Sequence, residues 1–178
     1  GFGKTIQTLT RIVEGKPHKS DKEDGWSGTT LVVCPLSVVD QWKAEVEKMT
    51  KLRVVKHQGT SRTTDPAQLR KHHVVVTTYD TVKSEYETYL PPAKDEGQAK
   101  LKLKSKSAPA LLPSNYGYAL NVCADEAHTI KNAKTKGAIA CCELEAKYRW
   151  CLTGTPIKNN VSELHSLFKF LHVKPYND

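Results

Sequence analysis

The first seven residues, Gly1-Phe2-Gly3-Lys4-Thr5-Ile6-Gln7, combine two glycines with a lysine and a threonine. Glycines let backbone N–H groups close on phosphate oxygens, and a helix that begins directly after them adds partial positive charge. In such a loop Lys4 would reach the phosphates and the Thr5 hydroxyl would ligate Mg²⁺. The candidate nucleotide-binding residues are therefore Gly1, Gly3, Lys4, Thr5 and Gln7. Taken alone, the motif is also compatible with an ordinary glycine turn.

Two adjacent acids, Asp125 and Glu126, end an apolar run at residues 120–124. A strand of that composition would cross the sheet and release both carboxylates at its edge. Asp125 would then hold Mg²⁺ and Glu126 would polarise a water that attacks the terminal phosphate. The alternative is a pair of surface acids that cap the following helix. His128 either couples this site to the next motif or acts as a hydrogen-bonded spacer.

A third motif, Thr153-Gly154-Thr155-Pro156, follows the apolar run at residues 148–152. Hydroxyl groups at the end of a strand can bond to the acid pair and to a neighbouring loop, so this turn could transmit the state of the nucleotide. By itself it is simply a good turn sequence.

The segments between these motifs predict an open α/β fold with a mainly parallel sheet flanked by helices. Short apolar or β-branched runs without polar alternation are typical of strands buried on both faces. They lie at residues 30–34, 53–56, 74–78, 120–124 and 148–152. Helical spacing of apolar residues follows the glycine loop and recurs at residues 39–49 and 161–171. Ligands of such a sheet bind at the carboxyl ends of its strands.

Composition is that of one globular domain, because 178 residues are enough to bury a core. The net charge of +8 favours an anionic partner such as nucleic acid, although a generally basic protein would look the same. No apolar run approaches the ~20 residues that span a bilayer, so we expect no membrane insertion, and we expect no membrane partner. None of the five cysteines forms a Cys-x-x-Cys pair, and those in apolar runs are expected to be buried.

Two polar segments interrupt the strand–helix alternation. Residues 15–28 predict a surface loop. Residues 91–113 are lysine-rich and bracketed by prolines, which predicts a disordered basic insertion. The insertion is either an arm that contacts nucleic acid or a solvated loop that happens to be basic.

In this order, the motifs resemble the first RecA-like lobe of the Swi/Snf-type ATPases of helicase superfamily two. The resemblance covers most of the chain, through motif I (1–7), motif Ia (33–42), a His57-Gln58-Gly59 segment, motif Ib (76–80), motif II (125–132, DEAHTIKN), motif III (152–159, LTGTPIKN) and residues 163–167. The insertion before motif II and the wording of that motif are most similar to the post-replication-repair and helicase-like transcription factor branch.

The resemblance implies a P-loop NTPase lobe over residues 1–178 that uses ATP and Mg²⁺. It implies a DNA-dependent ATP hydrolase that translocates on double-stranded DNA in the nucleus, in chromatin remodelling or DNA repair, with nucleosomes or repair proteins as further partners. By the same resemblance Ser37, Gln41, Thr77 and Thr78 would lie near the DNA backbone. The coupling residues would be His128, Thr153, Gly154 and Thr155.

Several departures from the family pattern bear on activity. Lys158 and Ala124 replace the usual residues at their positions, and the chain begins inside the phosphate loop. The family also has a strand before that loop, which lies inside the sheet, and a second lobe with an arginine finger. We therefore expect an open groove in the sheet and negligible ATP hydrolysis by this chain alone. The alternatives are an inactive truncated fragment and an RNA helicase lobe, although RNA helicases usually carry Ser-Ala-Thr in motif III.

Overall fold

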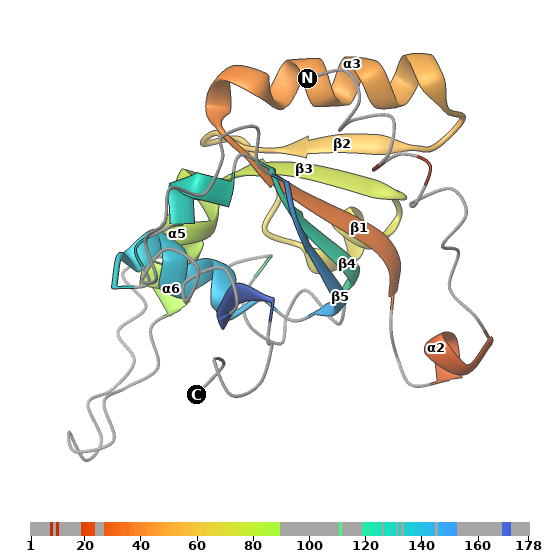
Figure 1. Ribbon diagram of the computed structural model, residues 1–178. Coiled ribbons are helices and arrows are strands. Elements are labelled where there is room, and N and C mark those ends of the chain that lie inside the picture. The colour runs from red at the N-terminus through yellow and green to blue at the C-terminus, as the bar shows by residue number, and fades with distance from the viewer. Residues whose placement is uncertain are drawn as a thin grey trace.

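The fold is a parallel sheet with helices on both faces (Figure 1). The computed structural model describes residues 8, 10, 19–23, 27–89, 111, 119–125, 127–130, 132, 134–144, 146–152 and 169–171. Its elements, with η for a 3-10 helix, are α2 (Lys19–Glu23), β1 (Ser27–Cys34), η1 (Leu36–Val38), α3 (Val39–Met49), β2 (Val54–His57), α4 (Pro66–Arg70), β3 (Val74–Thr78), α5 (Tyr79–Tyr89), β4 (Ala119–Ala124), η2 (Ala127–Ile130), α6 (Lys136–Cys142) and β5 (Ala146–Cys151).

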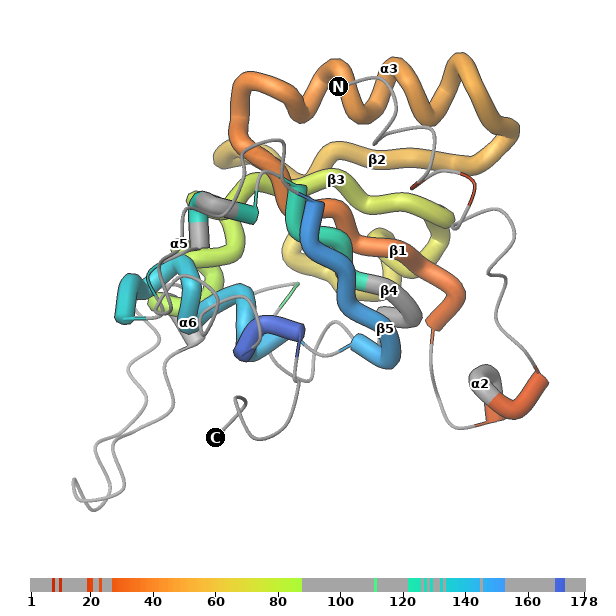
Figure 2. The backbone as a smooth tube through the Cα atoms, viewed as in Figure 1, coloured from red at the N-terminus to blue at the C-terminus, as the bar shows by residue number. Residues whose placement is uncertain are grey.

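All five predicted strands are present, and every neighbouring pair is parallel. Their order across the sheet is β2-β3-β1-β4-β5, so β1 runs through the middle with β3 on one side and β4 on the other (Figure 2). The bounds of β3 are those predicted, whereas β1 begins earlier, at Ser27. This arrangement confirms the α/β fold expected from the continuous apolar runs.

Successive residues of β1 pack on opposite faces of the sheet. Val32 and Cys34 lie in a cluster with Trp42 and Val46 of α3. Leu31 and Val33 lie in the other cluster, which contains residues of α5 and α6. Because both faces are covered by helices, the strand needs no polar alternation, and its residues from Thr29 to Cys34 are all buried.

Four features differ from the sequence-based expectations. The five described strands pair without a gap, so the groove expected within the sheet does not occur between them. The expected loop at residues 15–28 contains α2 and the first residues of β1. Helices α4, α5 and α6 had no predicted counterpart. Most of the predicted insertion at residues 91–113 lies outside the described residues, but Leu111 within it is 1% exposed and belongs to the core.

The described residues offer no metal-binding cluster of three His, Cys, Asp or Glu side chains. Cys34 and Cys123 are fully buried free thiols, as expected for small apolar residues, and Cys151 is half-buried. Within the described part of the chain, every helix is too short or too polar to cross a membrane.

Candidate functional site

The carboxyl ends of β1, β3 and β4 meet at one edge of the sheet, and Asp125 lies there, directly after β4. Its backbone N–H donates to the Val33 carbonyl at 2.8 Å. Leu152 N–H donates to the Ala124 carbonyl, and Ala127 N–H returns a bond to the Leu152 carbonyl, both at 2.8 Å. These bonds hold the turn that follows β4, and they leave Asp125 only 7% exposed.

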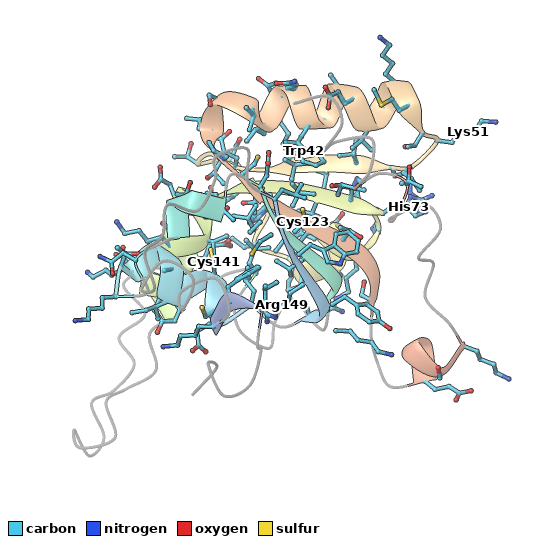
Figure 3. The ribbon with its side chains drawn as sticks, in the orientation of Figure 1. Trp42, Lys51, His73, Cys123, Cys141 and Arg149 are labelled. Atoms are coloured by element: carbon cyan, nitrogen blue, oxygen red, sulfur yellow. The ribbon has the colours of Figure 1, made fainter. Side chains whose placement is uncertain are left out.

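Two aromatic side chains from different segments bond to Asp125. The indole Nε1–H of Trp42 donates to its Oδ2 at 2.7 Å, and the Tyr79 hydroxyl donates to its backbone carbonyl at 2.6 Å. Figure 3 shows Trp42 between α3 and the sheet. Burial raises the pKa of the Tyr79 phenol far above its usual range, so the hydroxyl remains a donor. Sequence reasoning placed Asp125 directly after a strand, as the structure does, but missed both of these partners.

The thiol of Cys34 lies at the same edge of the sheet. It donates to the Thr77 carbonyl at 3.5 Å. Burial raises its pKa to about 12, and the negative charge of Asp125 adds to the rise. Cys34 is therefore a neutral neighbour of the carboxylate at ordinary pH, and it does not act as a nucleophile.

The residues predicted from motif Ia are exposed at the carboxyl end of β1. Ser37 lies in η1 and Gln41 in the first turn of α3, and both are open to solvent. The Gln41 amide donates to Glu45 Oε1 at 3.3 Å along the helix surface. Both side chains can therefore reach an external ligand with little rearrangement.

The residues predicted from motif Ib are buried instead. Thr77 is 0% and Thr78 is 3% exposed. The Thr77 hydroxyl donates to the His57 carbonyl at 2.7 Å, and the Thr78 hydroxyl accepts from Thr81 N–H at 3.0 Å at the start of α5. Their hydroxyls bond within the chain, so their role as DNA-contacting residues stays a prediction.

The remaining predicted residues lie outside the described part of the chain. They are Gly1, Gly3, Lys4, Thr5, Gln7, Glu126, Thr153, Gly154 and Thr155. The backbone of His128 lies in η2, but its side chain is outside the part of the chain that the structure describes. The roles assigned to all of these residues stay predictions.

The chemistry of Asp125 fits the magnesium ion that the family resemblance implies. A carboxylate is the hard oxygen donor that Mg²⁺ prefers, and this ion is usually held by one or two carboxylates together with phosphate oxygens. Asp125 is such a carboxylate, nearly buried, and the donor that Trp42 presents to it is neutral.

A second buried polar contact lies close to this edge. His57 at the end of β2 and Glu85 in α5 are 0% and 4% exposed, and His57 Nε2 lies 3.1 Å from Glu85 Oε2. The next residues continue the His57-Gln58-Gly59 segment, in which Gly59 has φ 88°. This left-handed conformation favours glycine. The pair ties β2 to α5, directly beside Thr77.

Comparison with known proteins gives a consistent set of matches. The family model of the SNF2-related domain matches residues 1–178. An uncharacterized ATP-dependent helicase of Schizosaccharomyces pombe is 38% identical over 186 residues, covering 100% of this chain and 17% of that protein. The DNA repair protein RAD5A of Arabidopsis thaliana is 38% identical over 153 residues, covering 84% of this chain and 13% of that protein.

Among solved structures, the SWI2/SNF2 ATPase core of Sulfolobus solfataricus in complex with dsDNA matches with a TM-score of 0.63. The two are 29% identical, and the match covers 96% of this chain and 29% of that one. The chain therefore spans less than a third of the length of each of these relatives.

Proposed function

The chain belongs to the SNF2-related domain family, and from this premise we propose that it is the ATP-hydrolysing lobe of a motor that translocates on double-stranded DNA. The observation that carries the proposal is the buried, oriented carboxylate of Asp125 at the carboxyl end of β4. This is where an open α/β sheet binds its ligands, and it is where the family's motif II begins.

In this proposal the residues of motif I and motif II divide the work on ATP. Gly1, Gly3, Lys4, Thr5 and Gln7 bind the nucleotide, and Thr5 and Asp125 hold Mg²⁺. When bound, Mg²⁺ neutralises charge on the phosphate oxygens. Glu126 orients the attacking water and takes its proton.

DNA binding is supported by the charge and by the exposed residues of motif Ia. The net charge of +8 attracts a polyanion, and Ser37 and Gln41 offer polar side chains at the same edge as Asp125. Contacts of this kind go to phosphate and sugar, which suits a motor that ignores sequence. The solved relative in complex with dsDNA agrees with this choice of ligand. We propose that Thr77 and Thr78 also lie near the DNA backbone, and we assign coupling of DNA to ATP to His128, Thr153, Gly154 and Thr155.

The setting of this activity is also part of the proposal. Relatives in DNA repair favour a nuclear protein that acts in repair or chromatin remodelling, with nucleosomes or repair proteins as partners. We further propose that residues 1–178 form one lobe and that they hydrolyse ATP negligibly by themselves. The family resemblance assigns the arginine finger to a second lobe.

Glu126→Gln in the protein that carries this domain tests the proposal. ATP turnover should fall by orders of magnitude while nucleotide binding is kept, because the general base is lost but the phosphate loop is intact. Glu47→Gln is the matched control, since Glu47 is an exposed glutamate of α3 that pairs with Lys43 at 2.8 Å. Unchanged turnover in Glu126→Gln would remove that residue from its role. Turnover absent from the unaltered protein would favour the inactive alternative.

A further inference from the structure

We propose that Trp42 is a positioning residue for Asp125, and that its indole N–H orients the carboxylate toward the magnesium ion. The inference rests on the proposed function, because it assigns a residue to the metal-binding step of that function. It concerns a residue of motif Ia, a segment whose other predicted roles are all directed to DNA.

The contact has the geometry of a strong hydrogen bond. The distance from Trp42 Nε1 to Asp125 Oδ2 is 2.7 Å, at the short end of the range for N–H donors to ionised oxygens. Trp42 is 3% exposed and Asp125 is 7% exposed, so water competes little for either atom. The two residues are 83 positions apart in the chain, so the bond joins separate elements of the fold.

Packing, and not the carboxylate, sets the position of the donor. Trp42 belongs to the apolar cluster that contains Val32 and Cys34 of β1 and Cys123 of β4. Val46, one turn further along α3, is 0% exposed in the same cluster. The helix is thus anchored to the two strands that lead to the site, and the indole N–H is held at a constant place.

The fixed indole N–H of Trp42 restrains the χ2 torsion of Asp125, which is the most easily rotated torsion of this metal ligand. The χ2 angle of aspartate has broad, shallow minima, so an unrestrained carboxylate turns readily. The Tyr79 hydroxyl holds the backbone carbonyl of Asp125 at 2.6 Å, and Trp42 holds the side chain. A carboxylate has about four lone-pair sites, and the bond from the indole N–H occupies one of them.

The inference predicts a specific loss in Trp42→Phe, which keeps an aromatic ring and removes the N–H. Partners that orient metal ligands are worth about 10–100-fold in metal affinity or activity. In the complete protein loaded with ADP, we expect Mn²⁺, used as a paramagnetic probe of the Mg²⁺ site, to bind about 10–100-fold more weakly in Trp42→Phe. Electron paramagnetic resonance of the free Mn²⁺ measures this directly.

Val46→Ala is the control for packing. It removes buried volume from the same face of α3 and the same cluster without touching Asp125. We expect it to lower stability and to leave Mn²⁺ affinity unchanged. Wild-type affinity in Trp42→Phe, or an equal loss in both variants, would overturn the inference.

A second measurement keeps Trp42 in place and needs neither nucleotide nor metal. In protein labelled with ¹⁵N-tryptophan, Asp125→Asn should move one indole N–H resonance upfield, because a neutral amide is a weaker acceptor. If no indole resonance moves, the hydrogen bond is absent and the inference is wrong.

The two proposals fail in different ways. If Asp125→Asn keeps Mn²⁺ binding and ATP turnover, the proposed function is wrong. If Asp125→Asn abolishes both and Trp42→Phe binds Mn²⁺ like the wild type, only the role of Trp42 is wrong.

Discussion

The buried pair of His57 and Glu85 gives a sharp test of how the structure is held together. We predict that Glu85→Ala strongly destabilises the domain. His57 Nε2 lies 3.1 Å from Glu85 Oε2 and 3.2 Å from Oε1, and His57 is fully buried. Its other ring nitrogen, Nδ1, has no hydrogen-bond partner among the described residues. Removing the carboxylate would therefore leave a buried imidazole without any partner that the structure describes.

The burial of the pair sets the expected magnitude. Removing one member of a buried charged or polar pair costs about 3–5 kcal/mol, because the remaining group stays desolvated. Glu85→Gln keeps an acceptor oxygen, so we expect it to cost about 1 kcal/mol. Replacing both members by apolar residues removes the unpaired group and should recover much of the loss in Glu85→Ala.

Glu87→Ala is a matched control on the same helix. The Glu87 side chain is 41% exposed, and its Oε1 lies 3.6 Å from Nζ of the exposed Lys136. An exposed ion pair of this kind contributes about 0–1 kcal/mol to the free energy of unfolding. Hydrogen exchange of peptides covering β2 and α5 measures the local stability in a protein of any size. A Glu85→Ala variant that exchanges no faster than Glu87→Ala would refute the reasoning.

Two further predictions concern Gly59 and Cys34. Gly59→Ala should lower the free energy of unfolding in urea by about 1–2 kcal/mol, because its φ of 88° is unfavourable for alanine. Gly137→Ala in α6 is the control: an added Cβ meets nothing within 4 Å at either glycine, so Gly137→Ala should instead stabilise by up to about 1 kcal/mol. Equal effects of the two substitutions would contradict the left-handed backbone at Gly59. Burial raises the pKa of Cys34 from 9.0 to about 12, so at pH 8 only about one thiol in 10,000 is the reactive thiolate. Mass spectrometry should therefore show much slower iodoacetamide labelling of Cys34 in the folded protein than in protein unfolded by guanidinium. Equal labelling rates would disprove the burial of this thiol. The same pKa shift makes the free energy of unfolding depend on pH. The contribution of Cys34 is fully present below pH 9 and is lost as the pH rises toward 12, because the unfolded thiol ionises in this range while the folded thiol stays neutral.

The sheet was predictable from the sequence because its strands are continuous apolar runs. In β3 all five residues are buried, so the pattern begins and ends with the strand. Helix α3 has Val39, Trp42 and Val46 on its buried face, at helical spacing. Met49 continues the same pattern but is 39% exposed, at the last residue of the helix.

The helices that the sequence did not reveal have buried faces with little hydrophobic signal. Thr81 and Glu85 lie on the buried side of α5, so polar residues interrupt the helical spacing of apolar residues there. The buried residues of α6 are Ala138, Ala140 and Cys141. Their side chains are small, so the sequence pattern of this helix resembles that of a loop. Among the helices for which the structure gives both bounds, periodicity therefore identified α3, whose buried side is made of large apolar side chains.

The positions of candidate site residues were predictable where one segment carried the signal. Asp125 could be placed at the edge of the sheet because an acid that ends an apolar run falls there. Its bonds to Trp42 and Tyr79 depend on β1 lying between β3 and β4, an order that no local pattern specifies. The three segments become neighbours only when the sheet is assembled.

The central place of β1 also has a consequence for how the chain is made. It is the first described strand to leave the ribosome, yet both of its partners come later: Thr30 pairs with Val74 on one side and with Asn121 on the other. Until those residues have been synthesised, Thr29 to Cys34 is an uncharged, β-branched segment with two open edges, a composition that promotes intermolecular pairing. Non-local pairing of this kind also slows folding. The strand that later supports the site is thus exposed to intermolecular pairing for as long as its partners are missing, which makes it a segment that a chaperone would have reason to bind.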